Sequence, residues 1–412
     1  MGVVRQAAGL APVQTFRSRP YRYLWTASLL WNNARWADQV ALGWLVFEVT
    51  DSAWHLALVG LLRSLPVMLF GVFGGMVADR FDRRWLLIVA QALGGLVSLG
   101  LALLIAFDRF VFEHAVVASL LFGLQWAVDW PARRALIPDL VGRELTSNAV
   151  ALESVSMNLS KVLGPLAAGW LIAYGGAASA YLVVAALFAV QTALLAMMPM
   201  PPRGDRPIAS GSMLRYLRQG WDELRLSEAI VGVLLITVFM NMLAFPHQTL
   251  LPVFARDVLS VDSVGLGMLG AAGGAGSLLG ALVLAGRGRL PKPGLLFAGG
   301  SVAMCVCLVG FALTRDFPFA LVLLGMSGLG QSAFSALQST IILGATSDQL
   351  RGRAMGALTV AIGTAPLGLL EIGALTAAFG APLAVAANAG LCALVTLLIA
   401  ARYPRLRKLD GS

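Results

Sequence analysis

The chain has 412 residues, of which 58% are hydrophobic and only 12% are charged. A soluble domain is about a quarter charged, so this composition excludes a soluble globular protein and indicates one embedded in a lipid bilayer. The net charge of +9 is carried by basic residues scattered over short polar segments, not gathered on one face, which argues against a nucleic-acid partner.

Twelve apolar segments are long enough to cross a bilayer, which takes roughly 20 helical residues. They are expected near 22–48, 54–78, 85–106, 115–137, 146–174, 178–200, 229–255, 263–286, 294–313, 317–343, 354–378 and 381–402. The predicted fold is therefore an all-α integral membrane protein with 12 transmembrane helices.

The basic residues are divided unevenly between the two ends of these segments. One side, which includes both termini and the long middle segment, holds 24 of the 30 lysines and arginines, and the opposite side holds 3. Cytoplasmic loops collect Lys and Arg. We therefore expect a multi-pass protein of the cell (inner) membrane with both termini in the cytoplasm.

The polar stretch at 201–228 divides the chain into two sets of six spans and carries the pattern of an amphipathic helix at the membrane surface. The two sets look related, because Gly123-Leu124 near the fourth span matches Gly328-Leu329 near the tenth. Duplication of this kind is typical of transporters that work by alternating access. The domains expected are pseudo-symmetric six-helix bundles at 1–200 and 229–412, joined by a cytoplasmic linker.

The segment from Gly74 to Arg84 carries five charges in its last six residues. Each charge in hydrocarbon costs a few kcal/mol or more, so the segment is predicted to be a cytoplasmic turn. Its pattern Gly75-x3-Asp79-Arg80-x-Asp82-Arg83-Arg84 resembles the signature between the second and third helices of the major facilitator superfamily, with Asp82 in place of a glycine. The form Asp-Arg-Phe-Asp-Arg-Arg is similar to the branch that exports drugs, macrolides and siderophores.

Further stretches resemble the same branch in order along nearly the whole chain. They begin at Ala41 (Ala-Leu-Gly-Trp-Leu-Val-Phe), Asp129 (Asp-Trp-Pro-Ala-Arg-Arg), Leu251 (Leu-Pro-Val-Phe-Ala-Arg-Asp) and Arg351 (Arg-Gly-Arg). The resemblance implies the major facilitator fold and a cytoplasmic gate, in which Asp79 faces the start of the eleventh span and Arg83 pairs with Asp139. The gate residues it implies are Gly75, Asp79, Arg80, Arg83, Arg84, Asp139, Arg351 and Arg353. The alternative is a solvated basic loop with no gating role.

The fifth span contains Ser160-x3-Gly164-Pro165-x2-Ala168-Gly169. This pattern resembles the antiporter signature of proton-coupled exporters, with Ser160 and Ala168 replacing glycines. The antiporter-like motif is thus Gly164, Pro165 and Gly169. Small residues also allow helices to approach closely, and proline bends a helix, so tight packing without a role in coupling is the alternative.

Four charged residues lie at a similar depth inside the predicted spans. Asp38, Arg63, Lys161 and Glu371 are each 16 or 17 residues from the cytoplasmic helix end, which is about 24 Å at 1.5 Å per residue. Charges at that depth are normally paired. We expect the ion pairs Asp38–Lys161 and Arg63–Glu371, with unpaired side chains in a wet cavity or reaching outer water as the alternative.

Polar residues on the spans predict a central cavity. Its expected lining is Asn32, Arg35, Gln39, Gln125, Asn158, Asn241, Gln248, Gln331 and Gln338. An apolar cavity with few charges suits lipophilic cations or large neutral compounds. Asp38 is the first choice as proton carrier, because a carboxylate in a low-dielectric site can bind a proton near neutral pH. Glu153 and Asp129 are the reserves, and each could instead be a static partner of Arg133 or Arg134.

The sequence contains no pattern typical of an enzyme. No Gly-Lys-Ser/Thr phosphate loop is present, and no spacing suggests a metal site or a cofactor. The three cysteines, Cys305, Cys307 and Cys392, lie in apolar segments and are expected to pack as small buried residues.

The sequence therefore predicts a secondary active transporter that exports bulky or amphipathic small molecules, such as drugs, macrolides or siderophores, in exchange for protons. The alternative is a facilitator or importer of a smaller polar metabolite on the same fold. The partners expected are the small-molecule substrate, protons and the lipid bilayer, and a monomer is expected.

Overall fold

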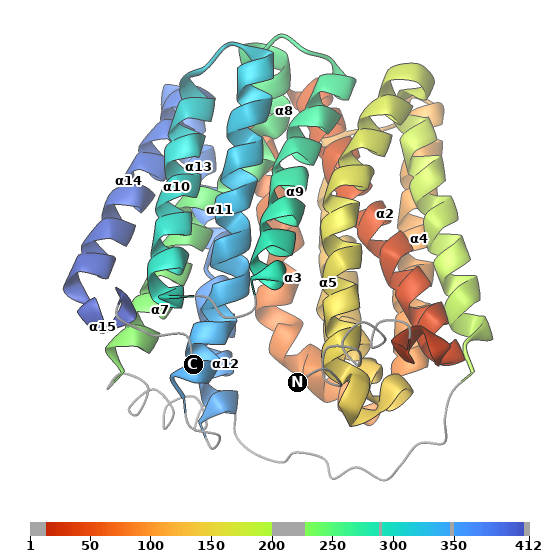
Figure 1. The fold of residues 1–412 in the computed structure, drawn as a ribbon. Helices are drawn as coiled ribbons and strands as arrows, with labels where there is room; N and C mark the ends of the chain where they lie inside the picture. Colours follow the sequence, from red (N-terminus) through yellow and green to blue (C-terminus); the bar gives the residue numbers. More distant parts are fainter. Residues whose placement is uncertain (1–13, 200–226, 288–290, 347–349, 408–412) are drawn as a thin grey trace. The chain divides into compact units, whose positions relative to one another are not determined.

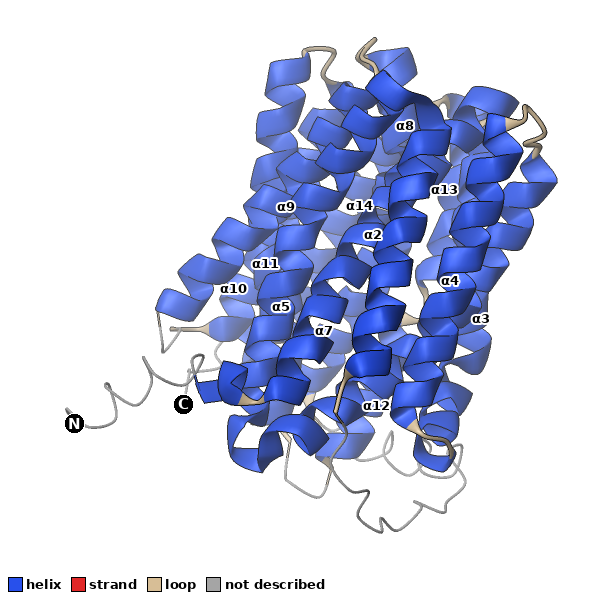
Figure 2. Cartoon of the chain, turned by 90° about the vertical axis from the view of Figure 1, so that its right-hand side faces the viewer, coloured by secondary structure: helices blue, strands red, loops and turns tan. Residues whose placement is uncertain are grey.

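The computed structural model describes residues 14–199, 227–287, 291–346 and 350–407, without the side chains of residues 71–80 and 143. Within these residues the chain is helical and contains no strand (Figure 2). It divides into two compact units, the first within Met1–Val49 and Leu62–Ile208 and the second within Thr50–Leu61 and Ala209–Ser412.

The first unit is built from four long helical elements, drawn from red to yellow-green in Figure 1. They are α2 (Arg19–Thr50), α3 (Ala53–Arg80), α4 (Arg83–Ala106) and α5 (Phe112–Met197). Gly142 (φ 77°) and Gly176 (φ 74°) interrupt α5, because positive φ values suit a residue without a Cβ. The element is therefore three helices, at 112–141, 143–175 and 177–197.

The second unit contains shorter and more broken helices, drawn from green to blue in Figure 1. They are α7 (Glu228–Phe239), η1 (Met240–Ala244), η2 (Phe245–Leu250), α8 (Leu251–Val253), η3 (Phe254–Val258), α9 (Ser263–Gly286), α10 (Pro293–Leu313), α11 (Phe317–Gly344), α12 (Arg351–Ile362), α13 (Ala365–Phe379), α14 (Ala381–Arg402) and α15 (Pro404–Arg407). The π and 3-10 turns of η1 to η3 surround Pro246 and Pro252, which lack the N–H that a regular helix needs.

The start of α3 belongs with the second unit. A Cβ at Gly60 would lie 3.3 Å from Leu369 and 3.4 Å from Thr249. Asp51, in the turn before α3, forms an ion pair with Arg256 of η3. Thr50–Leu61 therefore groups with the later helices, which a contiguous division of the chain does not include.

Three aspartates start helices that the sequence places at polar turns. The carboxylate of Asp82 accepts from the backbone N–H of Trp85 at the start of α4 (3.0 Å). Asp262 accepts from Gly265 at α9 (3.0 Å), and Asp316 accepts from Phe319 at α11 (2.7 Å). A side-chain acceptor at this position satisfies an N–H that has no partner within the helix, so each polar turn also fixes where the next span begins.

Ten helical segments of the described chain are long and apolar enough to cross a membrane. One of them, Glu144–Met197, is bent at Gly176 into two stretches, and α2, which has 32 residues, is not among the ten because it is more polar. Counting both gives the predicted 12 crossings. The all-α membrane fold expected from the sequence is confirmed.

The interior of the first unit fixes α2 against the middle part of α5. The Tyr21 hydroxyl donates to the carbonyl of Ala149 (3.0 Å), and the Trp25 indole donates to the carbonyl of Leu152 (3.0 Å). Further along, a Cβ at Gly164 would lie 2.7 Å from the Cβ of Trp36. The two helices therefore touch where the charged residues of α2 are located.

The three cysteines are free and buried, as expected from the sequence. Two of them lie beside Met240 in the second unit, with sulfur–sulfur distances of 3.8 Å from Cys305 and 3.5 Å from Cys392. These contacts join η1, α10 and α14 through small polarizable side chains.

Candidate functional site

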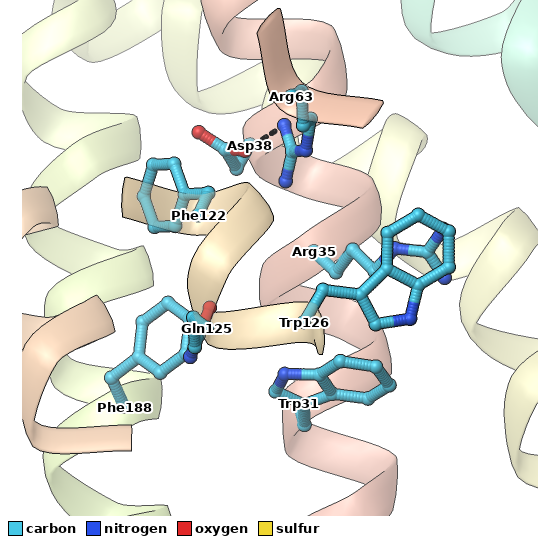
Figure 3. Close-up of a pocket in the computed structure, with 8 residues that line it drawn as sticks. All are labelled: Trp31, Arg35, Asp38, Arg63, Phe122, Gln125, Trp126 and Phe188. Atoms are coloured by element: carbon cyan, nitrogen blue, oxygen red, sulfur yellow. Dashed lines mark hydrogen bonds and ion pairs between the residues drawn. The ribbon is translucent and has the colours of Figure 1, made fainter. Parts of the chain in front are cut away.

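Two cavities adjoin each other inside the first unit and share Trp31. We call the first the Arg35 cavity; it has a volume of about 10 Å³ and is lined by Trp31, Arg35, Asp38, Arg63, Phe122, Gln125, Trp126 and Phe188 (Figure 3). We call the second the Glu153 cavity; it has a volume of about 50 Å³ and is lined by Trp31, Asn32, Trp130, Arg133, Arg134, Ile137, Val150, Glu153, Ser154 and Met157. One water needs roughly 10–15 Å³ of such space, so the second cavity has room for a few.

Asp38 and Arg63 form a buried ion pair in the Arg35 cavity. The Arg63 Nη1 lies 2.5 Å from Asp38 Oδ2, and the Asp38 side chain is 1% exposed (Figure 3). The Tyr181 hydroxyl donates to the other carboxylate oxygen at 3.1 Å. α3 approaches α5 closely here, because a Cβ at Gly123 would collide with the backbone carbonyl of Arg63.

The expected pair Asp38–Lys161 is wrong, because Asp38 pairs with Arg63. The expected pair Arg63–Glu371 would join the two units and stays a prediction. Asp38 and Arg63 share one level, as their depth predicts, but they pair with each other. Glu371 accepts from the Asn388 amide (2.7 Å). Lys161 has its Nζ 5.7 Å from the centre of the Trp36 ring. The depth of a charged residue along its helix does not show which neighbouring helix its side chain contacts.

Asp129 and Arg133 form a second buried ion pair, on one face of α5. Arg133 donates through Nε and Nη2 to the two Asp129 oxygens, both at 2.8 Å, and the side chains are 4% and 0% exposed. Gln91 donates to Asp129, and Arg133 also donates to the Ser28 hydroxyl (2.8 Å). For Asp129 the geometry favours the static-partner interpretation over the role of proton carrier.

Glu153 differs from these two carboxylates. It lines the Glu153 cavity together with Arg133 and Arg134. Its Oε1 is buried and has no hydrogen-bond partner among the described residues, and Glu153 forms no ion pair within that part of the chain. Of the three candidate proton carriers, Glu153 is therefore the one that accepts a proton without breaking an ion pair.

Arg35 is surrounded by aromatic rings. Its guanidinium lies 4.0 Å from the centre of the Trp126 ring, 5.5 Å from that of Trp36 and 5.8 Å from that of Trp31. A cation over an indole face is attracted by the ring quadrupole. Figure 3 shows Arg35 and Trp126 side by side, with Asp38 turned toward Arg63.

The expected contact between Arg83 and Asp139 is present. Arg83 Nη1 lies 2.8 Å from Asp139 Oδ2 and donates to the carbonyl of Ala135 at 2.9 Å. Arg84 donates to the carbonyl of Leu195 (2.8 Å) at the end of α5. Whether these contacts form a gate stays a prediction. The side chains of Gly75, Asp79 and Arg80 lie outside the described residues, and Arg351 and Arg353 lie in the first turn of α12.

The remaining residues predicted to line a cavity divide into two groups. Asn32 and Gln125 line the two cavities just described. The others have local roles or lie half-buried: Asn158 donates to Ser154 (2.9 Å), Asn241 donates to Thr237 (2.9 Å), Gln338 accepts from Thr237 (3.4 Å), and Gln39, Gln248 and Gln331 are half-buried on α2, η2 and α11.

The sequence did not single out several residues that complete the site. Trp31, Phe122, Trp130 and Phe188 supply its aromatic walls, and Tyr181 holds Asp38. A usable signal exists only for the Asp129–Arg133 pair, whose spacing of four residues places both side chains on one helix face. Among the described residues, no group of three His, Cys, Asp or Glu could hold a metal ion.

Comparison with known proteins places this architecture among transporters. The family described as transmembrane secretion effector matches residues 7–412. The staphyloferrin A transporter of Staphylococcus aureus is 26% identical over 306 residues, covering 74% of this chain and 73% of the relative. The enterobactin exporter of Escherichia coli is 29% identical over 354 residues, covering 81% and 83%.

Solved structures support the fold alone. A bacterial homologue of the human lysosomal transporter Spinster, in an inward-facing and unoccupied conformation, matches with a TM-score of 0.71 and 16% identity, covering 95% of this chain and 96% of that one. A POT family transporter in complex with a thioalcohol-conjugated peptide matches with a TM-score of 0.75 and 11% identity, covering 94% and 96%.

Proposed function

Because the chain belongs to the transmembrane secretion effector family of the major facilitator superfamily, we propose that it exports bulky or amphipathic small molecules in exchange for protons. It is a multi-pass membrane transporter and not an enzyme. Two relatives are named for siderophores, staphyloferrin A and enterobactin, which supports a cargo of that kind over a small metabolite. Drugs and macrolides are the other cargo classes of the proposal.

Glu153 carries the proposal of proton coupling. A proton on Asp38 would compete with Arg63, and a proton on Asp129 would compete with the two-point contact from Arg133. Glu153 forms no ion pair in the described chain, although Arg133 and Arg134 line the same cavity. The Glu153 cavity also has room for water, which a proton needs as a path to a buried carboxylate.

The charged and polar groups around Glu153 come from two helices besides its own. Arg133, Arg134 and Asp129 belong to the first part of α5, and the Ser28 hydroxyl and the neutral phenol of Tyr21 belong to α2. Trp31 lines both cavities, so a change at Glu153 can reach the Arg35 cavity through one shared side chain. In this proposal cargo and proton use the first unit in alternate halves of the transport cycle.

The proposal places the protein in the inner membrane as a monomer, with both termini in the cytoplasm. The contact between Arg83 and Asp139 (2.8 Å) would then lie on the cytoplasmic side and hold α4 against α5 in one conformation. Its opening in the other conformation is part of the proposed alternating-access cycle.

The experiment compares wild type with Glu153→Gln. A susceptibility panel of cells with and without the protein first identifies an exported compound, which is then followed in proteoliposomes. Wild type should expel it faster when a pH gradient drives protons in the opposite direction. Glu153→Gln should keep exchange of labelled for unlabelled cargo but lose the acceleration by the gradient, because a glutamine cannot carry a proton.

Asp38→Asn is the matched control, since it also removes one buried carboxylate. If Asp38→Asn loses the acceleration while Glu153→Gln keeps it, Asp38 is the carrier and the assignment to Glu153 is wrong. If wild type equilibrates the compound at the same rate with and without a gradient, the protein is a facilitator, and proton-coupled export is abandoned.

A further inference from the structure

Two cations of the first unit lie against one tryptophan ring whose own indole N–H lacks an acceptor among the described residues. Arg35 and Lys161 both lie against the Trp36 ring, at 5.5 Å and 5.7 Å from its centre. The indole Nε1 of Trp36 is itself buried and has no hydrogen-bond partner among the described residues. A buried donor without an acceptor costs about 1–3 kcal/mol. The Trp36 indole N–H and the two cations beside it would therefore be stabilised by an acceptor from a bound ligand.

The charges of the interior are also out of balance. The cations are Arg35, Arg63, Arg133, Arg134 and Lys161, and the carboxylates are Asp38, Asp129 and Glu153. Arg63 and Arg133 are neutralised by ion pairs, whereas Arg35 and Lys161 have no carboxylate within ion-pair distance in the described chain. Unpaired charges inside a membrane protein are costly and mark functional sites.

The packing of α2 on α5 places Lys161 beside the Trp36 ring. Lys161 lies one helical turn before Gly164, and the space beside Gly164 is filled by Trp36, with its Cβ 2.7 Å from where a side chain would begin. A carbonyl of α2, that of Asn33, lies 3.0 Å from the same point. The missing side chain at Gly164 therefore lets α5 bring Lys161 to the ring that Arg35 also contacts.

We propose that Arg35, Lys161 and the Trp36 indole N–H form the recognition site for an anionic oxygen group of the cargo, so that the transporter selects organic anions. This inference rests on the proposed export function and narrows it. The sequence alone suggested lipophilic cations or neutral compounds, but three donors and an excess of two positive charges repel a cation and attract a carboxylate-like group. Trp31, Trp126 and Phe122 line the Arg35 cavity, which has a volume of about 10 Å³ in this conformation and has to widen to place the rest of the molecule against these rings.

The probes are two dyes with the same xanthene ring system and opposite charge, fluorescein and tetramethylrhodamine ethyl ester. Binding to the purified protein in nanodiscs is followed by fluorescence anisotropy at one pH. Wild type should bind fluorescein saturably and at least about tenfold more tightly than the rhodamine ester, because close charge pairs are worth a factor of ten or more. Arg35→Gln and Lys161→Gln should each weaken fluorescein about tenfold.

The control is Arg109→Gln, which removes one positive charge from the exposed turn between α4 and α5. It should leave fluorescein affinity unchanged. Lys161→Glu should reverse the preference toward the rhodamine ester, which a merely misfolded variant would not do. Each variant is first checked for a monodisperse peak in size-exclusion chromatography.

A second measurement tests whether transport moves net charge across the membrane. When an anion leaves in exchange for a proton, negative charge moves out and positive charge moves in. An inside-negative potential, imposed with valinomycin and a potassium gradient, should therefore accelerate fluorescein export from proteoliposomes. Exchange of a monovalent cation for one proton moves no net charge and should not respond.

Equal binding of the two dyes by wild type, or fluorescein affinities that Arg35→Gln and Lys161→Gln leave unchanged, would overturn the anion site. The proposed function is tested separately, by whether a pH gradient drives export. Export of another compound under a pH gradient, without fluorescein binding, keeps the function and removes the inference. Saturable, Arg35-dependent fluorescein binding without any gradient-driven export keeps the inference and removes the function.

Discussion

The two units differ in the side-chain contacts of their interiors, although both consist of membrane-spanning helices. The first unit buries two ion pairs, Asp38–Arg63 and Asp129–Arg133, and an additional carboxylate at Glu153. In the second unit, α9, α10 and α11 contain no charged residue. Its interior contacts include rings, such as Phe254 and Phe311 at 4.6 Å, the sulfurs around Met240, and a deep carboxylate, Glu371, held by a neutral amide.

The second unit, which has fewer buried charges, has the more irregular backbone. The first unit has long regular helices that bend at glycines, whereas the second is interrupted by π and 3-10 turns at η1 to η3 and again between α12 and α13. Irregular backbone is tolerated at membrane depth only where protein or a wet cavity satisfies it. The comparison teaches that a fold of two helical units can concentrate the ionic chemistry in one unit and the helix breaks in the other.

The largest effect is expected at the buried pair of the first unit. Arg133→Gln leaves Asp129 charged without its cation and should destabilise the protein by about 3–5 kcal/mol. The measurement is thermal unfolding in detergent, followed by tryptophan fluorescence. The double variant Asp129→Asn, Arg133→Gln should recover part of the loss, because it removes both charges. A melting temperature that Arg133→Gln does not change would show that this pair does not support the first unit.

A smaller effect is expected from closing the gap between α2 and α5. Gly164→Ala places a Cβ 2.7 Å from Trp36 and should cost about 1–3 kcal/mol, while weakening fluorescein binding at Lys161. Gly368→Ala, which collides with the backbone of Met242 in the second unit, should lose similar stability but keep fluorescein affinity. Gly100→Ala has open space around it and is the neutral control. Equal loss of affinity in both Gly164→Ala and Gly368→Ala contradicts a site confined to the first unit.

The smallest effect is expected at the deep carboxylate of the second unit. Glu371 accepts a hydrogen bond from the neutral amide of Asn388 (2.7 Å), and Glu371→Gln keeps an acceptor at that place. Stability should change by less than about 1 kcal/mol, and acceleration of export by a pH gradient should persist. Loss of the gradient effect in Glu371→Gln would make the second unit a participant in proton coupling and end the contrast between the units.

Much of the architecture follows from the sequence, because length and apolarity decide what can cross a membrane. The helix starts at Asp82 and Asp316 follow from polar turns. The contact between Arg83 and Asp139, implied by the resemblance to the superfamily, is present at 2.8 Å. These features depend on local sequence or on a motif that covers both partners.

The partners of the deep charges could not be predicted in the same way. Counting residues from a helix end gives the level of Asp38, Arg63 and Lys161 but not the direction in which each side chain points. That direction depends on the close approaches at Gly123 and Gly164. The sequence of an apolar helix does not show which neighbour fills the space beside a glycine, so the Asp38–Arg63 pair could not be predicted.

The burial of the cysteines has a practical consequence for following this molecule at work. Cys305 and Cys392 are 0% exposed and Cys307 is 8% exposed, and all three belong to the second unit. A water-soluble maleimide should therefore react slowly with the native chain. Single cysteines introduced along the wall of the Glu153 cavity could then be labelled with little reaction at the native cysteines. The rate of labelling would report how often that wall is accessible to water.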